Sequence, residues 1–159
     1  MNSLLITYNI LKNDSAVNTA TSGRISPLRL PQATSFPAIS YFQVSLVANQ
    51  TQLGYSKTDF ARVQINIFGM TIASCTSLAA QVRTAMQSAP GIFNGVICHD
   101  IKFDQEVLLS DDTAGEEGIY HIAQDYILMF NRDLTISAYK LLLESGDFML
   151  LESGDKILG

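Results

Sequence analysis

The sequence predicts an α+β fold: a mixed, mainly antiparallel β-sheet with two helices packed on one face, followed by a C-terminal β-meander or arm. Three observations lead to this prediction. Residues 40–47 and 61–68 alternate between apolar and polar side chains, as half-buried strands do. From Thr71 onward, apolar residues recur at helical spacing instead. Near the end of the chain, the six residues 142–147 recur unchanged as 150–155.

Length and composition indicate one globular domain with an appendage. The chain has 159 residues, of which 47% are hydrophobic and 16% charged, enough for a core without disulfides or metal. We expect a domain over residues 1–132 and a leucine-rich extension over residues 133–159. No apolar run is long enough to span a membrane, and the N-terminus lacks the pattern of a signal peptide. Cys75 and Cys98 share no metal-ligand spacing, which favours reduced core residues.

The N-terminal third predicts one helix and one connector. Leu4, Tyr8 and Leu11 fall on one stripe at helical spacing, and Asn2 or Ser3 can cap the helix. We expect a polar loop over residues 15–23. Residues 24–39 contain three of the four prolines, which excludes a helix interior or a central strand and predicts an extended connector.

Two strands and a long loop are predicted next. In residues 40–47, Phe42, Val44 and Leu46 alternate with polar or amphipathic neighbours and share one face. Residues 48–60 are expected to form a long hairpin loop. The following strand has a clear inward-facing set: Ala61, Val63, Ile65 and Ile67.

The second half repeats the order of helix, strand and strand. The predicted helix begins at Thr71 and ends at the Ser-Ala-Pro-Gly stretch of residues 88–91. Its apolar stripe contains Ile72, Cys75, Leu78, Ala79, Val82 and Met86. Residues 96–103 and 118–130 read as strands joined by an acidic loop.

Charge is divided unevenly along the chain. Residues 1–83 contain six basic and two acidic residues, a net of +4, whereas residues 84–159 contain four and thirteen, a net of −9. Such a protomer can pack its positive half against a neighbour's negative half. The alternative is that the acids lie in solvated loops. In either case, a net acidic protein is not a general nucleic-acid binder.

The sequence gives no positive indication of an enzyme or a cofactor. The Walker, dinucleotide-binding and nucleophile-elbow motifs are absent. In Cys98-His99-Asp100, neighbouring side chains of a strand point to opposite faces, so we expect a buried cysteine beside an exposed histidine rather than a thiolate pair. A weaker alternative is a metal site, set against a solvated polar face. Its ligands would be His99, His121, Asp100, Asp104 and Asp125.

Three segments resemble the tail terminator, or tail completion, proteins of long-tailed bacteriophages. "GRISPLRLPQ" (23–32) is similar to the family's Gly-Arg-Ile-x-Pro segment with its following Pro-Gln. "FPAISYFQVS" (36–45) resembles its Pro-x-Ile-x-Tyr strand. "ARVQINIFGMTIASCTSLAAQVRTAM" (61–86) resembles its Arg-Val-Gln-Ile strand and the helix that follows. The likeness spans about residues 4–132, and the order of the motifs makes it more specific than any motif alone.

The resemblance implies a non-enzymatic virion protein made in the host bacterial cytoplasm. It implies a hexameric ring that caps the tail tube, ends tube polymerisation and joins the tail to the head connector or stopper protein, with genomic DNA passing through the lumen. The runner-up functions are a head-side adaptor or stopper and, from another class, a small metal-dependent hydrolase. We expect acidic residues to line the lumen: Asp111, Asp112, Glu116 and Glu117. Expected interface residues are Arg24, Arg29, Arg62, Leu142, Leu143, Leu150 and Leu151.

The terminal repeat lies beyond this resemblance. Ser-Gly turn dipeptides at 145–146 and 153–154 separate short leucine-rich runs, which predicts a three-strand meander or an arm with two tight turns. Consecutive leucines would place apolar side chains on both faces of a strand. We therefore expect the segment to pack against another subunit or extend its sheet. The alternative is a loosely folded tail.

Overall fold

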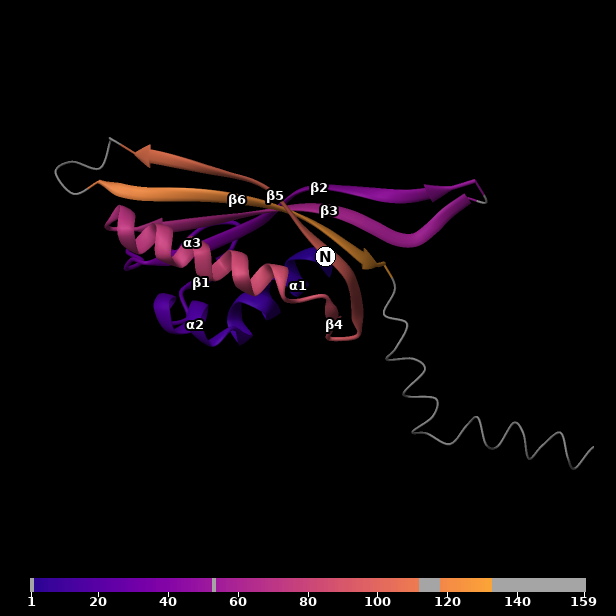
Figure 1. Cartoon of the computed structure of the whole chain (residues 1–159), viewed down its shortest axis with the longest axis horizontal. Helices are drawn as coiled ribbons and strands as arrows, with labels where there is room; N and C mark the ends of the chain where they lie inside the picture. Colours follow the sequence, from indigo (N-terminus) through magenta and orange to yellow (C-terminus); the bar gives the residue numbers. More distant parts are fainter. Residues whose placement is uncertain (1, 53, 112–117, 133–159) are drawn as a thin grey trace, which may run out of the picture.

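A computed structural model describes residues 2–52, 54–111 and 118–132, which form a six-stranded sheet with helices on one face (Figure 1). The strand order is β1-β2-β3-β6-β5-β4, with β1 parallel to β2 and every other pair antiparallel. The elements are α1 (Asn2–Asn13), α2 (Ser15–Thr21), β1 (Ile25–Pro27), β2 (Ala38–Thr51), β3 (Gly54–Gly69), α3 (Ile72–Gln87), β4 (Gly91–Phe93), β5 (Val96–Asp111) and β6 (Ile119–Asn131). The predicted α+β class is confirmed, with a third helix and two further short strands.

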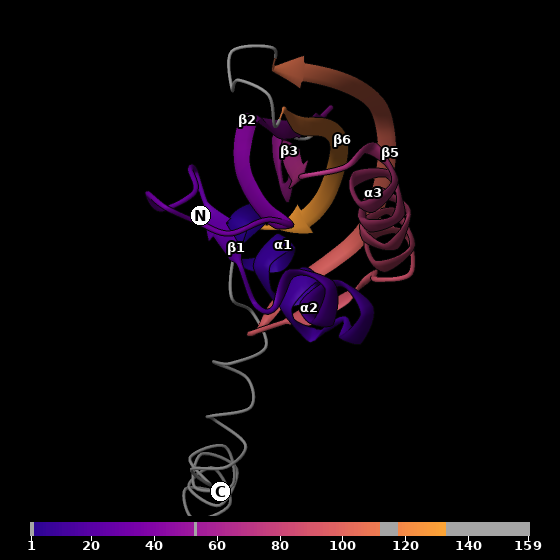
Figure 2. The ribbon, with the colours of Figure 1, turned by 90° about the vertical axis from the view of Figure 1, so that its left-hand side faces the viewer.

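The core lies between the helices and the inward face of β3 and β6. All four residues predicted to point inward from β3 are fully buried. On β6 they face Ile122, Gln124, Tyr126 and Leu128, which are also buried. The sheet curls strongly along its width, so that β2 and β5 bend away from a common plane (Figure 2). The alternation of β3 therefore predicted the central layer correctly.

The N-terminal prediction was partly wrong. Residues 2–13 do form a helix, but Leu4 and Tyr8 are only partly buried. Its buried side consists of Ser3, Ile6, Thr7, Ile10 and Leu11. The expected polar loop is the helix α2, because the Asp14 side chain accepts a hydrogen bond from the Val17 backbone N–H (2.9 Å) and caps it. Burial of Val17 fixes this short helix against the core.

A β-bulge overturned the predicted faces of β2. The register shifts between Gln43 and Ser45, which inserts one residue and returns Leu46 to the helix-covered face, opposite Ala61. Tyr41, which precedes the bulge, is buried on the same helix-covered face, whereas Phe42 points to the other. The long hairpin loop was also wrong, since β2 extends to Thr51 and β3 begins at Gly54.

The helix predicted from Thr71 onward forms as α3, and its apolar stripe differs from the prediction at two positions. Thr71 caps α3 in a reciprocal capping box with Ser74. Ile72 is half exposed and leaves the apolar stripe, whereas Ala85 joins it. Both later strands form, with β5 reaching Asp111 and therefore entering the expected loop. None of the helices in the described part of the chain has the length and apolarity needed to cross a membrane.

Candidate functional site

One side of the sheet ends in an open strand edge on β2. Within the described residues, β1 covers β2 only through residues 39–41. Beyond them lies a stretch that we call the β2 edge, residues 44–48. Three of its side chains, Val44, Leu46 and Val47, are 49% to 61% exposed. Residues 45–48 pair regularly with β3, between a register shift at Gln43/Ser45 and another at Ala48/Gln50. Their backbone N–H and C=O groups on the side away from β3 are therefore in strand geometry.

The opposite side of the sheet ends in a second open edge on β5. β4 covers β5 only through residues 96–98, as far as the described chain extends. We call residues 104–109 the β5 edge. It combines exposed acids, Asp104 and Glu106, with apolar side chains at Val107, Leu108 and Leu109 that are 43% to 54% exposed. An exposed strand with apolar side chains is a surface on which another chain can pair.

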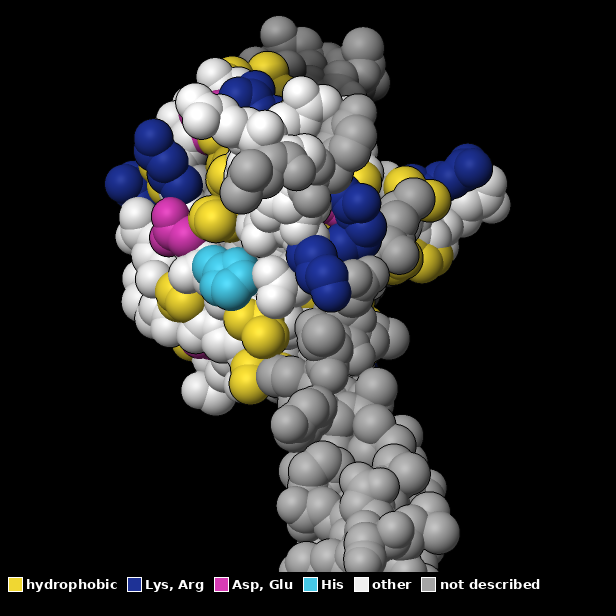
Figure 3. Space-filling model, turned by 90° about the vertical axis from the view of Figure 1, so that its right-hand side faces the viewer, with side chains coloured by type: hydrophobic (Ala, Val, Ile, Leu, Met, Phe, Trp, Pro, Cys, Tyr) yellow, Lys and Arg dark blue, Asp and Glu magenta, His cyan; other side chains and the backbone are white. Residues whose placement is uncertain are grey.

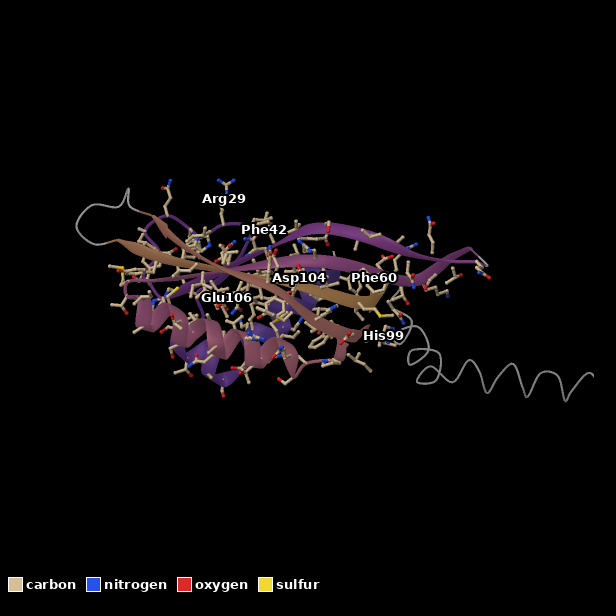
Figure 4. All side chains as sticks on the ribbon, turned by 45° about the horizontal axis from the view of Figure 1, so that its top comes forward. Arg29, Phe42, Phe60, His99, Asp104 and Glu106 are labelled. Atoms are coloured by element: carbon tan, nitrogen blue, oxygen red, sulfur yellow. The ribbon has the colours of Figure 1, made fainter. Side chains whose placement is uncertain are left out.

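A polar cluster holds the β5 edge to the helix-free face of the sheet. Asp104, labelled in Figure 4, is bound by Arg62 of β3 through Nη2 (2.6 Å). Arg62 also approaches Asp125 on β6 through Nη1 (3.8 Å). Gln105 Nε2 donates to the same Asp125 carboxylate (2.9 Å). Asp125 is almost fully buried, so these donors offset the loss of its hydration. The cluster therefore fixes the start of the β5 edge relative to β3 and β6.

A buried glutamine fixes the same edge from the helix side. Gln124 on β6 donates to the Ala79 carbonyl (3.0 Å) and to Glu106 (2.6 Å), and it accepts from the Tyr126 hydroxyl (2.8 Å). Burial raises the pKa of Tyr126, so this hydroxyl remains a donor at ordinary pH. Sequence reasoning missed Gln124, although its position two residues from both Ile122 and Tyr126 places it on the inward side of β6.

The two histidines do not share a site. His121 contacts Asn66 (Nε2 to Oδ1, 2.9 Å) and stacks on Phe68 with ring centroids 4.5 Å apart. His99 contacts Asn131 at the far end of β6 (2.7 Å). Ten residues of strand separate these two positions on β6, or roughly 33 Å.

The metal-site alternative was therefore wrong about its ligands. No cluster of three or more metal-ligating side chains occurs in the described ranges. Burial lowers the pKa of His121. Cys98 is buried and His99 exposed, as predicted, and burial raises the pKa of the Cys98 thiol to about 11. A thiol with such a pKa is a poor nucleophile at neutral pH.

The predicted interface and lumen residues are scattered. Arg24 donates from Nε to the Pro37 carbonyl (3.0 Å), and Arg29 is exposed on the connector before β2 (Figure 4). Arg62 belongs to the polar cluster. Asp111 ends β5. The remaining predicted residues lie outside the described part of the chain: Asp112, Glu116, Glu117, Leu142, Leu143, Leu150 and Leu151.

Basic side chains gather at one end of the strands. At the end where β6 stops, basic side chains predominate over acidic ones (Figure 3). Lys57 and Lys102 are exposed, whereas Asp59 is buried and bound by the Arg132 guanidinium (2.6 Å). The β5 edge carries the acids Asp104 and Glu106 near the middle of the sheet, with Arg62 bound to Asp104. Lys102 and Arg132 come from the net-negative half of the chain, so the described residues do not separate charge by chain half.

Comparisons with known proteins agree with this architecture. The family model described as "Tail completion protein gp17" matches residues 8–130, most of the chain. No curated protein matches the sequence significantly. A chain in a solved structure entitled "Virion of native gene transfer agent (GTA) particle" has a similar fold, with a TM-score of 0.66 at 12% identity. The match covers 79% of this chain and 91% of that one. The chain therefore belongs to the tail completion protein gp17 family, and it is a structural virion protein rather than an enzyme.

Proposed function

We propose that the protein forms a ring, hexameric as its family resemblance implies, that caps the tail tube and ends its polymerisation. The observation that carries this proposal is the pair of unlike open edges on one sheet. A ring closes when one surface of each copy binds a different surface of the next. The β5 edge and the β2 side of the sheet are two such surfaces, and each presents apolar side chains beside strand backbone.

Strand direction supports this arrangement. β2, β3, β6 and β5 alternate in direction, so β2 and β5 at the two sides run antiparallel to each other. When copies are related by rotation about a ring axis, the β5 of one copy therefore meets the β2 side of the next in antiparallel orientation. The unequal charge of the two chain halves favours the same head-to-tail contact and disfavours like-with-like pairing.

The proposed position is the junction between tail and head. The partners would be the tube protein on one side of the ring and the connector or stopper protein on the other. DNA would pass through the lumen without specific binding, consistent with a net charge of −5. The acids at the end of β5 and in the residues after it, Asp111, Asp112, Glu116 and Glu117, would line the lumen and repel the phosphate backbone.

Binding to the two candidate partners tests this position. Purified full-length protein is mixed separately with tail tubes and with head connectors, and complexes are separated by sedimentation. A terminator binds tube ends in the absence of heads. Binding only to head connectors would instead identify a head-side adaptor or stopper, and binding to neither would refute the junction role.

A further inference from the structure

The described chain ends beside the β2 edge. Asn2 Nδ2 donates to the Arg132 carbonyl (2.9 Å), and the Arg132 backbone N–H donates to the Lys57 carbonyl (2.7 Å). The Arg132 side chain forms two hydrogen bonds with the buried Asp59 carboxylate (2.6 and 3.1 Å). These bonds fix the point at which residues 133–159 leave the domain.

A hollow connects this exit point with the β2 edge. It has a volume of about 390 Å³ and is lined by Asn2, Gln43, Leu46, Asp59, Phe130 and Arg132. Arg132 and the exposed Leu46 therefore border the same depression. α1 begins at Asn2, which also borders the hollow.

We infer that the C-terminal segment, residues 133–159, docks on its own chain along the β2 edge and adds a leucine-rich run to the sheet as a further strand. This differs from the expectation that the segment packs on another subunit. The docked strand would lie on the β2 side that the proposed ring also uses, but docking concerns a single chain and can be tested without ring formation. Strand addition at an open edge satisfies backbone hydrogen bonds while side chains alternate between the two faces.

The distance allows this docking within one chain. From β6, the added strand lies three strand spacings away, beyond β3 and β2, or about 14 Å. Residues 133–139 precede the first leucine run and can span up to about 23 Å when extended. A tether this short gives an effective concentration in the millimolar range, which favours the chain's own segment over that of another copy.

Side-chain pattern and charge both match the β2 edge. Leu46 lies on the helix-covered face and Val47 on the opposite face, so the edge is apolar on both sides. Leu141, Leu142 and Leu143 are consecutive and would supply leucines to both faces of an added strand. Residues 133–159 contain five acidic and two basic residues, a net of −3, and they leave from the end of the domain where basic side chains predominate.

Hydrogen exchange of the β2 edge tests this inference in the full-length protein. A variant with serine in place of Leu142, Leu143, Leu150 and Leu151 removes the apolar side chains from both repeats. A matched control, Ser145→Ala with Ser153→Ala, alters the same segment but keeps every leucine. Amides of residues 63–67 in the core report whether each variant remains folded.

We expect β2-edge amides to exchange at least tenfold more slowly in the native and control proteins than in the leucine variant. The protection should be unchanged over a 50-fold dilution, because docking within one chain does not depend on concentration. Equal exchange in all three proteins would overturn the inference. Protection that disappears on dilution would also overturn it, since the cover would then come from a second copy. Protected β2-edge amides in a protein that remains monomeric would support docking of the C-terminal segment and refute only the proposed ring.

Discussion

At the scale of single residues, two neighbouring buried polar side chains of β6 each bind several partners. Gln124 is fully buried and connects α3, β5 and β6 through three hydrogen bonds. Asp125, its neighbour, points to the other face and has Arg62 and Gln105 as partners. Both residues fix β5, the strand that carries the proposed assembly surface. Specific positioning of that edge, rather than catalysis, explains why such polar groups are buried.

The half-buried His121 predicts a pH dependence of stability. Burial lowers its pKa in the folded state below the ordinary value of 6.5, so the unfolded chain takes up the proton first as the pH falls. The stability that the neutral His121 side chain contributes is therefore fully present above pH 6.5. It is lost as the pH falls from 6.5 toward the pKa of the folded state. One proton limits the slope to about 1.4 kcal/mol per pH unit.

Urea unfolding between pH 7.5 and 5.5 measures this effect. We expect the free energy of unfolding to fall more for the native protein than for His121→Gln, which keeps a donor near Asn66 but does not titrate. His99 is present in both proteins and cancels in the comparison. Identical pH profiles would show that the His121 environment does not disfavour the imidazolium ion.

Residue-level patterns gave the core of β3 but not the polar contacts. The alternation of residues 61–67 predicted their buried side correctly because β3 is paired on both sides and has no extra residue that would interrupt the alternation. The contacts Arg62–Asp104 and His121–Asn66 depend on strand order and register, which one strand's own sequence does not contain. The metal alternative was wrong for the same reason: residue types were suitable, but register separates the two histidines.

At the scale of elements, local irregularities decided which predictions were wrong. The bulge near Val44 reversed the face of Leu46, and no sequence feature of residues 40–47 marks it. The helix α2 is only seven residues long and mainly polar, so its one sequence indication is Asp14 at the capping position. The mainly polar region 48–60 reads as a loop, yet its backbone pairs across β2 and β3 almost to the tip.

The reciprocal cap of α3 predicts a measurable loss when it is removed. Thr71→Ala eliminates the side-chain acceptor of the Ser74 backbone N–H, and we expect the free energy of unfolding to fall by about 1 kcal/mol. Thr84→Ala is the matched control, because Thr84 is exposed in the same helix and bonds only the Ala80 carbonyl. Denaturant unfolding of both variants measures the difference. Equal values would mean that packing alone determines where α3 begins.

At the scale of the whole molecule, two unlike open edges and an uneven charge distribution describe a protomer built for assembly. The long strands β2, β3, β6 and β5 form the sheet, and the described residues leave most of its two outer edges, on β2 and on β5, without a neighbouring strand. In an isolated monomer, such edges invite uncontrolled association. Pairing between unlike edges of neighbouring copies, with the C-terminal segment on the β2 side, would use them in a closed and finite structure.

A charge placed on the β5 edge should prevent ring formation. Leu108→Asp introduces an acid into the proposed contact, where it would be desolvated next to Glu106. We expect loss of the assembled form in native mass measurements, with little change in melting temperature because the side chain is half exposed in the monomer. Ile92→Asp on β4 is the control, since that residue is similarly exposed but lies outside both edges. Equal assembly of the two variants would exclude the β5 edge from the ring contact.

The central claim is that this protein caps tail tubes, and growth of the tubes tests it most directly. Purified tubes are incubated with the full-length protein, free tube subunits are added, and tube lengths are measured by electron microscopy. The account predicts a single ring at one end of each tube and no further growth from that end. Continued growth from both ends, or protein bound along the tube wall without an end ring, would contradict it.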